Sequence, residues 1–159
     1  MADHLFGLGF DVHPRDERRP LHLGGLRWDG EPGLAGHSDG DVVCHAVADA
    51  LLGAASLGDL GEHFPEGDPA TAGVAGGDLL RRAVGLAAEV GVAPAQCDVV
   101  VLADRPAIAS RRDEVQVALA RLLGIDPGFV SVKASRPEGL GLTGDGAGCL
   151  ALVVAVRRG

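Results

Sequence analysis

Apolar residues recur along this chain with two different periods, and these periods predict its secondary structure. Short apolar runs bounded mainly by Gly, Pro or Asp predict five β-strands, within residues 4–10, 21–28, 97–103, 129–135 and 149–156. Longer segments predict three helices, over residues 41–56, 77–90 and 110–123. Because strands and helices do not alternate strictly, the pattern indicates an α+β fold.

The predicted helices carry signals at their ends. Ser38 and Asp39 precede the first helix and are candidate N-caps, since short polar side chains accept hydrogen bonds from the free N–H groups there. Gly91 follows the second helix and predicts its end. Ser110 is the expected N-cap of the third helix, which Gly124 closes.

Two segments are too rich in Gly and Pro for regular structure. Residues 61–77 predict a mobile loop, the usual place of a functional lid, and residues 136–148 predict a second loop with five glycines in thirteen positions. Neither segment is a domain linker, because each half of the chain alone would lack a core. We therefore expect one domain over residues 1–159.

Composition and charge narrow the classes of function. The formal net charge is −8, aromatic residues make up 3% and Tyr is absent, which disfavours nucleic-acid binding because phosphates need Lys and Arg and bases stack on aromatic rings. No apolar stretch approaches the roughly 20 residues of a membrane-spanning helix, and no secretory signal is evident. Cys44, Cys97 and Cys149 lack CxxC spacing, which is typical of reduced core thiols. We expect a cytoplasmic protein that contacts neither nucleic acid nor membranes.

The first predicted strand leads into Asp11 and His13, which are two residues apart and therefore lie on the same face. A carboxylate and an imidazole on one face suit a metal ion. A DxH pattern alone is weak, however, and a surface pair is the commoner explanation.

The predicted helix over residues 41–56 is apolar around most of its circumference, so we expect it to be buried. Its polar exceptions are Asp41, His45 and Asp49, spaced four apart on one face. A carboxylate one helical turn from His45 would fix the tautomer of the imidazole, and His45 becomes the candidate third ligand beside Asp11 and His13. Two His and one carboxylate with an open position are typical of catalytic zinc. The alternative is that His45 is a core residue with satisfied hydrogen bonds, and spacing alone does not bring the strand and helix together.

Three stretches carry a family resemblance: GFDVHP, GHSDGDVVCHAVADALLGAASLGDLGEHFPEGDP and VSVKASRPEGLGLTGDGAG. They resemble the 2-C-methyl-D-erythritol 2,4-cyclodiphosphate synthase family in order and over essentially the whole chain. The resemblance implies a mixed four-stranded sheet with helices packed on one face, and a homotrimer with active sites between subunits. It also implies a lyase of non-mevalonate isoprenoid precursor biosynthesis. This lyase cyclises 4-diphosphocytidyl-2-C-methyl-D-erythritol 2-phosphate to 2-C-methyl-D-erythritol 2,4-cyclodiphosphate and releases CMP.

Carried over by position, the resemblance implies one Zn²⁺ per active site on Asp11, His13 and His45. Glu138 would bind a second divalent ion, Mg²⁺ or Mn²⁺. Catalytic roles would fall to His37, Arg136 and Glu138. The implied contacts to the nucleoside-diphosphate substrate are Asp11, His13, His37, Ser38, Asp59, Leu60, Gly61, Phe64, Pro65, Glu66, Gly67, Asp68, Ala103, Asp104, Arg105, Pro106, Ala107, Ile108, Ala109, Ser135, Arg136, Pro137, Glu138, Leu142 and Asp145. Alternatives stay open for two of these: Asp59 could merely cap a turn, and Glu138 could be a solvated loop charge.

The sequence departs from the family pattern on the nucleotide and phosphate side. Ala107 stands where the family has Lys, Arg136 where it has a hydroxyl, and Asp145 where it has Arg; Ala147 replaces a Glu. The Arg136 guanidinium can take over the charge lost at Ala107, whereas Asp145 would repel a phosphate or act at the trimer axis. These departures keep two alternatives open: a paralogue acting on another nucleoside-diphosphate-linked substrate, and a non-catalytic relative that binds zinc and nucleotide.

Overall fold

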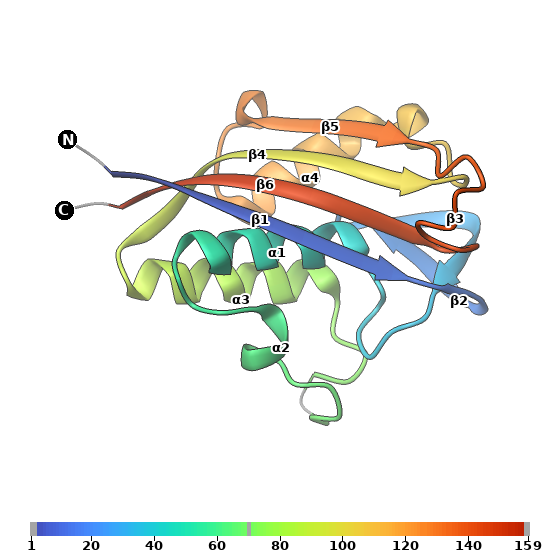
Figure 1. The fold of residues 1–159 in the computed structure, drawn as a ribbon, viewed down its shortest axis with the longest axis horizontal. Coiled ribbons are helices and arrows are strands. Elements are labelled where there is room, and N and C mark those ends of the chain that lie inside the picture. The colour runs from blue at the N-terminus through green and yellow to red at the C-terminus, as the bar shows by residue number, and fades with distance from the viewer. Residues whose placement is uncertain (1–2, 70, 158–159) are drawn as a thin grey trace.

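The computed structural model describes residues 3–69 and 71–157 and is built around one mixed four-stranded sheet (Figure 1). The strands, in spatial order, are β1 (Asp3–His13), β6 (Ala147–Arg157), β4 (Val92–Ala103) and β5 (Val130–Ser135). β6 is antiparallel to both neighbours, whereas β4 and β5 are parallel. The α+β fold with a mixed four-stranded sheet is therefore confirmed.

A separate two-stranded hairpin consists of β2 (Arg15–Leu23) and β3 (Leu26–Leu34). The prediction of a single strand over residues 21–28 is wrong, because Gly24 and Gly25 reverse the chain in its middle. Their φ angles are 66° and 76°, and consecutive glycines with positive φ suit the tight turns that match strand twist. Leu23 consequently pairs with Leu26 across the turn.

The helices lie on one face of the sheet (Figure 1). They are α1 (Val42–Ala54), α2 (Leu60–His63), α3 (Gly76–Glu89) and α4 (Arg112–Leu123), with short 3₁₀ turns η1 (Ile108–Arg111) and η2 (Pro127–Phe129). The three predicted helices correspond to α1, α3 and α4. The loop prediction over residues 61–77 is partly wrong, because most of α2 and the start of α3 lie inside it.

Two of the predicted caps are also wrong. Asp41, and not Ser38 or Asp39, is the N-cap of α1. Arg111 occupies the cap position of α4 without a side-chain hydrogen bond, while the Ser110 hydroxyl donates to the carbonyl of Ala107 within η1. The other end of α4 is as predicted, since Gly124 takes the left-handed conformation.

At Gly7 and Gly9 the strand β1 contacts α1 without side chains of its own. A β-carbon added at Gly7 would lie 1.7 Å from the carbonyl oxygen of Ala50, and one at Gly9 would lie 1.9 Å from that of Ala46. The helix backbone therefore rests directly on the strand. Alternate strand residues share a face, so Asp11 and His13 face the same side as these glycines.

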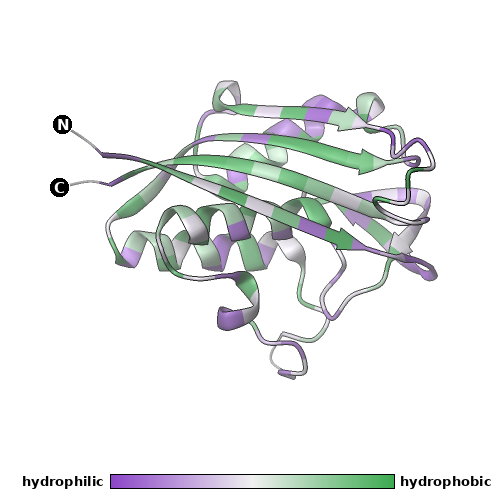
Figure 2. Cartoon of the chain, viewed as in Figure 1, coloured by the Kyte–Doolittle hydropathy of each residue, from purple (hydrophilic) through white to green (hydrophobic). Residues whose placement is uncertain are grey.

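The opposite face of the sheet is apolar and exposed. Figure 2 shows hydrophobic residues along the strands of the sheet as well as in the helices beneath it. The exposed large apolar side chains on β1 and β6 are Phe6, Leu8, Phe10, Val12, Leu150 and Leu152. A contiguous patch of this kind on a protein surface marks an interaction site.

Within the described ranges, no helix has the length and apolar character needed to cross a membrane.

Candidate metal and substrate site

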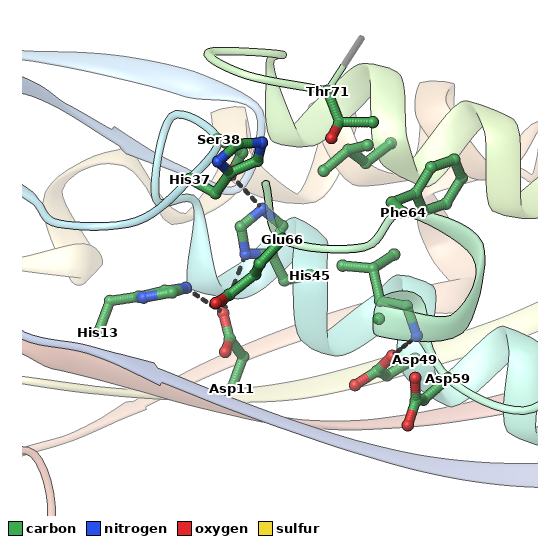
Figure 3. A pocket seen from close by; sticks show the side chains of 13 residues that line it. Asp11, His13, His37, Ser38, His45, Asp49, Asp59, Phe64, Glu66 and Thr71 are labelled. Carbon is green, nitrogen blue, oxygen red and sulfur yellow. Dashed lines mark hydrogen bonds and ion pairs between the residues drawn. The ribbon is translucent and has the colours of Figure 1, made fainter. Parts of the chain in front are cut away.

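A cavity of about 300 Å³ opens where the end of β1 meets α1 (Figure 3). Its wall comes from β1, from the loop before α1, from α1 itself, from the segment around and after α2, and from α3. The lining residues are Asp11, His13, His37, Ser38, His45, Asp49, Asp59, Leu60, Gly61, Phe64, Glu66, Thr71 and Leu79.

Asp11, His13 and His45 meet at one point in this cavity (Figure 3). The Oδ2 atom of Asp11 lies 3.0 Å from Nε2 of His13 and 3.0 Å from Nδ1 of His45. One potential ligand atom from each residue lies within 4.8 Å of the other two. The predicted convergence of strand and helix is therefore confirmed, and the donor set fits a divalent metal such as zinc, which favours imidazole nitrogens and a carboxylate oxygen.

The ionised form of Asp11 also suits a metal. Burial alone would raise the pKa of Asp11, but hydrogen bonds from His13 and His45 outweigh it and lower that pKa to about 2. Burial likewise opposes the charged form of His45, but its hydrogen bond to Asp11 raises its pKa. Asp11 is thus an anion at neutral pH, as a metal ligand must be.

The second ring nitrogen of His45 has its own partner. Nε2 lies 2.9 Å from Oγ of Ser38, so a metal on Nδ1 would leave Nε2–H to donate to the serine. Such a partner fixes the tautomer and orientation of a ligating imidazole. The interpretation that a carboxylate one turn along α1 fixes this ring is therefore wrong, because Ser38 does so.

Asp41 has a different role from the one its spacing suggested. Its buried carboxylate accepts from Val43 and Cys44, at 3.1 and 3.0 Å, as the N-cap of α1. It also accepts from Gly24 and Gly25, at 2.8 and 2.7 Å. One side chain therefore joins the hairpin turn to the start of the helix that carries His45.

Asp49, the third member of the predicted stripe, lines the cavity and accepts a 2.6 Å hydrogen bond from the backbone of Leu60. Burial raises the pKa of Asp49. Asp59 also lines the cavity, but its carboxylate accepts from Glu62 at 2.9 Å and so caps α2. The capping alternative for Asp59 therefore describes one of its contacts, alongside its place in the cavity wall.

The loop before α1 is held in place from both sides. Nε2 of His37 donates to the carbonyl of Asp68 at 3.1 Å. The Arg19 guanidinium on β2 donates to the carbonyls of Gly36, at 2.7 Å, and Ser38. These hydrogen bonds therefore fix His37 and Ser38 beside the Asp11–His13–His45 triad.

The structure separates the predicted site residues into two groups. Those of the first half of the chain line the cavity, except Pro65, Gly67 and Asp68, which belong to the segment beside it. None of the predicted residues from 103–109 and 135–145 lines it. They lie instead at the adjacent sheet end, where Ala147 pairs with both His13 and Ala103.

Some residues of the nucleotide side have exposed side chains in the single chain. Arg136 and Glu138 are exposed, and Glu138 has a left-handed φ of 54°. In the single chain Glu138 therefore has the solvated loop position that was the alternative to metal binding.

Three lining residues were missed as site residues: Asp49, Thr71 and Leu79. Asp49 had a usable signal in its place on the polar stripe of α1. Thr71 and Leu79 had none, because the path of the segment after α2 brings them to the cavity.

Comparison with known proteins agrees with this geometry. The model of the YgbB family matches residues 5–157. The 2-C-methyl-D-erythritol 2,4-cyclodiphosphate synthase of Symbiobacterium thermophilum is 48% identical over 155 residues, which cover 98% of this chain and 99% of the relative.

Solved structures give the same result. A 2C-methyl-D-erythritol-2,4-cyclodiphosphate synthase in a CDP-bound form matches with a TM-score of 0.87 at 35% identity, covering 94% of this chain and 99% of that one. The bifunctional IspDF of Campylobacter jejuni matches with a TM-score of 0.93 at 36% identity, and this chain spans 43% of its length. The chain described here belongs to the YgbB family.

Proposed function

We propose that this protein is a metal-dependent lyase that converts 4-diphosphocytidyl-2-C-methyl-D-erythritol 2-phosphate into 2-C-methyl-D-erythritol 2,4-cyclodiphosphate and CMP. The observation that carries the proposal is the Asp11–His13–His45 triad, which faces a cavity in a chain that matches the YgbB family over residues 5–157. The full-length relative named for this activity supports it.

In the proposed reaction an oxygen of the 2-phosphate forms a bond to the β-phosphorus. The bond from that phosphorus to the oxygen bridging the α- and β-phosphates breaks, and the oxygen leaves with CMP. Such a transfer depends chiefly on holding the phosphates in line and on stabilising charge. Zinc on Asp11, His13 and His45 would supply a Lewis acid for a phosphate oxygen.

The residues of the cavity would orient the substrate. His37 and Ser38 lie beside the triad and would contact the phosphate. Asp59 and Phe64 would line the space for the methylerythritol chain. The hydrogen bond of His37 to the Asp68 carbonyl fixes the direction of its ring before substrate arrives, which lowers the reorganisation that the reaction requires.

The nucleotide would be held by residues 103–109 and 135–145 of a neighbouring subunit in a homotrimer. Two observations support this assembly: none of these residues lines the triad cavity, and the sheet face bearing Phe6, Leu8 and Phe10 is apolar and exposed. Glu138 would bind Mg²⁺ or Mn²⁺ beside the diphosphate, and Arg136 would stabilise its charge. We further propose that residues 1–159 act as one domain in the cytoplasm.

The test is to incubate the purified protein with the cytidylyl substrate, Zn²⁺ and Mg²⁺ and to follow the phosphorus signals of CMP and the cyclic diphosphate by NMR. We expect both products to appear together, and a His45→Ala variant to form neither. A folded, zinc-loaded protein that releases no CMP at high enzyme concentration would refute the proposal.

A competition series separates the standard substrate from a related one. Ala107 and Asp145 motivate this control. Relative to the family pattern, Ala107 removes a cation and Asp145 adds an anion on the nucleotide side of the site. We expect CDP to bind more tightly than ADP, GDP or UDP. A preference for another base would assign the chemistry to a different nucleoside-diphosphate substrate.

A further inference from the structure

Arg15 joins three segments that are far apart in the sequence. It is the first residue of β2, two residues after the metal-ligand candidate His13. Its Nε donates to the carbonyl of Asp145 at 3.2 Å, Nη1 to that of Pro32 at 2.9 Å and Nη2 to that of Arg105 at 3.2 Å. All three acceptors are backbone atoms, so the contacts fix the path of the chain whichever side chains stand there.

We propose that Arg15 is a positioning residue for the nucleotide half of the site. It holds the segment around Arg105 and the segment around Asp145 in a fixed relation to each other and to the β2–β3 hairpin. The inference rests on the proposed function, in which residues 103–109 and 135–145 contact the nucleotide. Arg15 itself touches no substrate and acts through these two segments.

The guanidinium group suits this role for a physical reason. It is planar, always charged and presents five N–H donors in a rigid fork, whereas a lysine ammonium is a single point charge. Hydrogen bonds from a charged donor are also stronger than those between neutral groups. One guanidinium can therefore join three carbonyls that no other described side chain joins.

Two further contacts show that the two segments lie near the end of β1 and near β3. A β-carbon added at Gly146 would lie 1.9 Å from the carbonyl oxygen of His13, so the chain after Asp145 passes directly against the end of β1. Nε of Arg105 lies 3.4 Å from Oε2 of Glu31 on β3. The Arg105 side chain of this ion pair is largely exposed, so the pair contributes little by itself. Nη2 of Arg15, by contrast, bonds the backbone carbonyl of Arg105 directly.

Holding loops in their binding conformation raises affinity, because less ordering remains to be done when the ligand arrives. Loss of Arg15 should therefore weaken nucleotide binding and leave the rate of the chemical step unchanged. Arg15→Ala should weaken CDP binding and raise KM by roughly tenfold, which corresponds to the ordering of one or two residues. Zinc content and kcat should stay within about twofold of the wild type.

Arg15→Lys is the second variant, because an ammonium can keep part of the contact with the carbonyls. We expect its CDP affinity to lie between those of the wild type and Arg15→Ala. The matched control is Arg18→Ala on the same strand. The Arg18 side chain is exposed and its hydrogen bonds go to the Asp16 carboxylate, so its loss should leave CDP affinity and KM unchanged.

Hydrogen exchange gives a readout that needs no ligand. Amides within residues 103–109 and 142–146 should exchange faster in Arg15→Ala than in the wild type, while those of β1 should not change. If exchange and CDP affinity are the same in both Arg15 variants as in the wild type, the inference is wrong. Faster exchange with unchanged CDP affinity also overturns it, and so does a fall in kcat and zinc content at constant KM. A wild type that binds no CDP refutes the proposed function instead, and with it the nucleotide role of Arg15.

Discussion

Gly9→Ala tests whether the bare contact between β1 and α1 sets the geometry of the metal site. The added β-carbon would lie 1.9 Å from the carbonyl oxygen of Ala46, and the obstacle is backbone, which cannot turn aside as a side chain does. To restore a contact of 3.4 Å the helix must withdraw by about 1.5 Å, an overpacking whose cost we place at about 3 kcal/mol.

His45 precedes Ala46 in α1, so the same withdrawal moves its imidazole away from Asp11. The 3.0 Å separation between Nδ1 and Oδ2 would leave hydrogen-bonding range, and the three metal ligands would no longer converge. We therefore expect Gly9→Ala to lose zinc affinity as well as stability. In a protein of this size about 3 kcal/mol corresponds to a fall in Tm of roughly 6–12 °C.

The assay is thermal unfolding in a chelator at fixed protein concentration, because bound metal and assembly both raise Tm. A zinc titration by calorimetry follows on the folded variant. Gly53→Ala is the matched control: it lies in α1, has no atom within 4 Å of an added β-carbon, and should stabilise the helix by about 0.5–1 kcal/mol. If Gly9→Ala is as stable as Gly53→Ala and binds zinc normally, the reasoning from the bare contact is wrong.

Three other predictions concern side chains around the triad. Ser38→Ala removes the acceptor for Nε2 of His45 and should weaken zinc binding by about 10- to 100-fold in a competition with a chromogenic chelator; unchanged affinity would show that the serine does not orient the ring. Asp41→Asn leaves fewer acceptor sites for four backbone N–H groups, so urea unfolding should show a loss of about 2–3 kcal/mol. Asp29→Asn, which changes an exposed carboxylate on the hairpin that Asp41 contacts, should alter stability little. The pKa of Asp11 is lowered to about 2 in the folded protein. This predicts about 2 kcal/mol of stability in the metal-free protein, which is complete above pH 4 and is lost as the pH falls towards 2. Asp11→Asn should flatten the dependence of stability on pH in this range, and an unchanged dependence would contradict the lowered pKa of Asp11.

The sequence was informative where one local pattern decided the structure. The Val-rich runs predicted β4, β5 and β6, and the helical periods predicted α1, α3 and α4, because burial of one face selects the period. The β2–β3 hairpin was missed since its Gly24–Gly25 turn lies within an apolar run. The cap of α1 was misassigned because several polar residues precede the helix, and only the fold shows which carboxylate meets the free N–H groups.

The metal ligands of the candidate site could also be predicted from local patterns in the sequence. Asp11 and His13 follow the strand period, and His45 stood out as a polar residue on an apolar helix. The partners that orient these ligands could not be predicted, because Ser38 and Arg19 reach the site through tertiary contacts alone. The nucleotide side remains a prediction, since its residues gather at a sheet end outside the cavity.

The carboxylate of Asp41 affects how the hairpin turn and the start of α1 unfold locally. Amides on both sides of it, at Gly24 and Gly25 in the turn and at Val43 and Cys44 in the helix, share this one acceptor group. Neither element can fray without exposing unpaired polar groups of the other, so the two should behave as one cooperative unit. The first turn of the helix that carries the candidate ligand His45 is therefore stabilised by the Gly24–Gly25 turn. A substitution that disrupts this turn should also weaken metal binding.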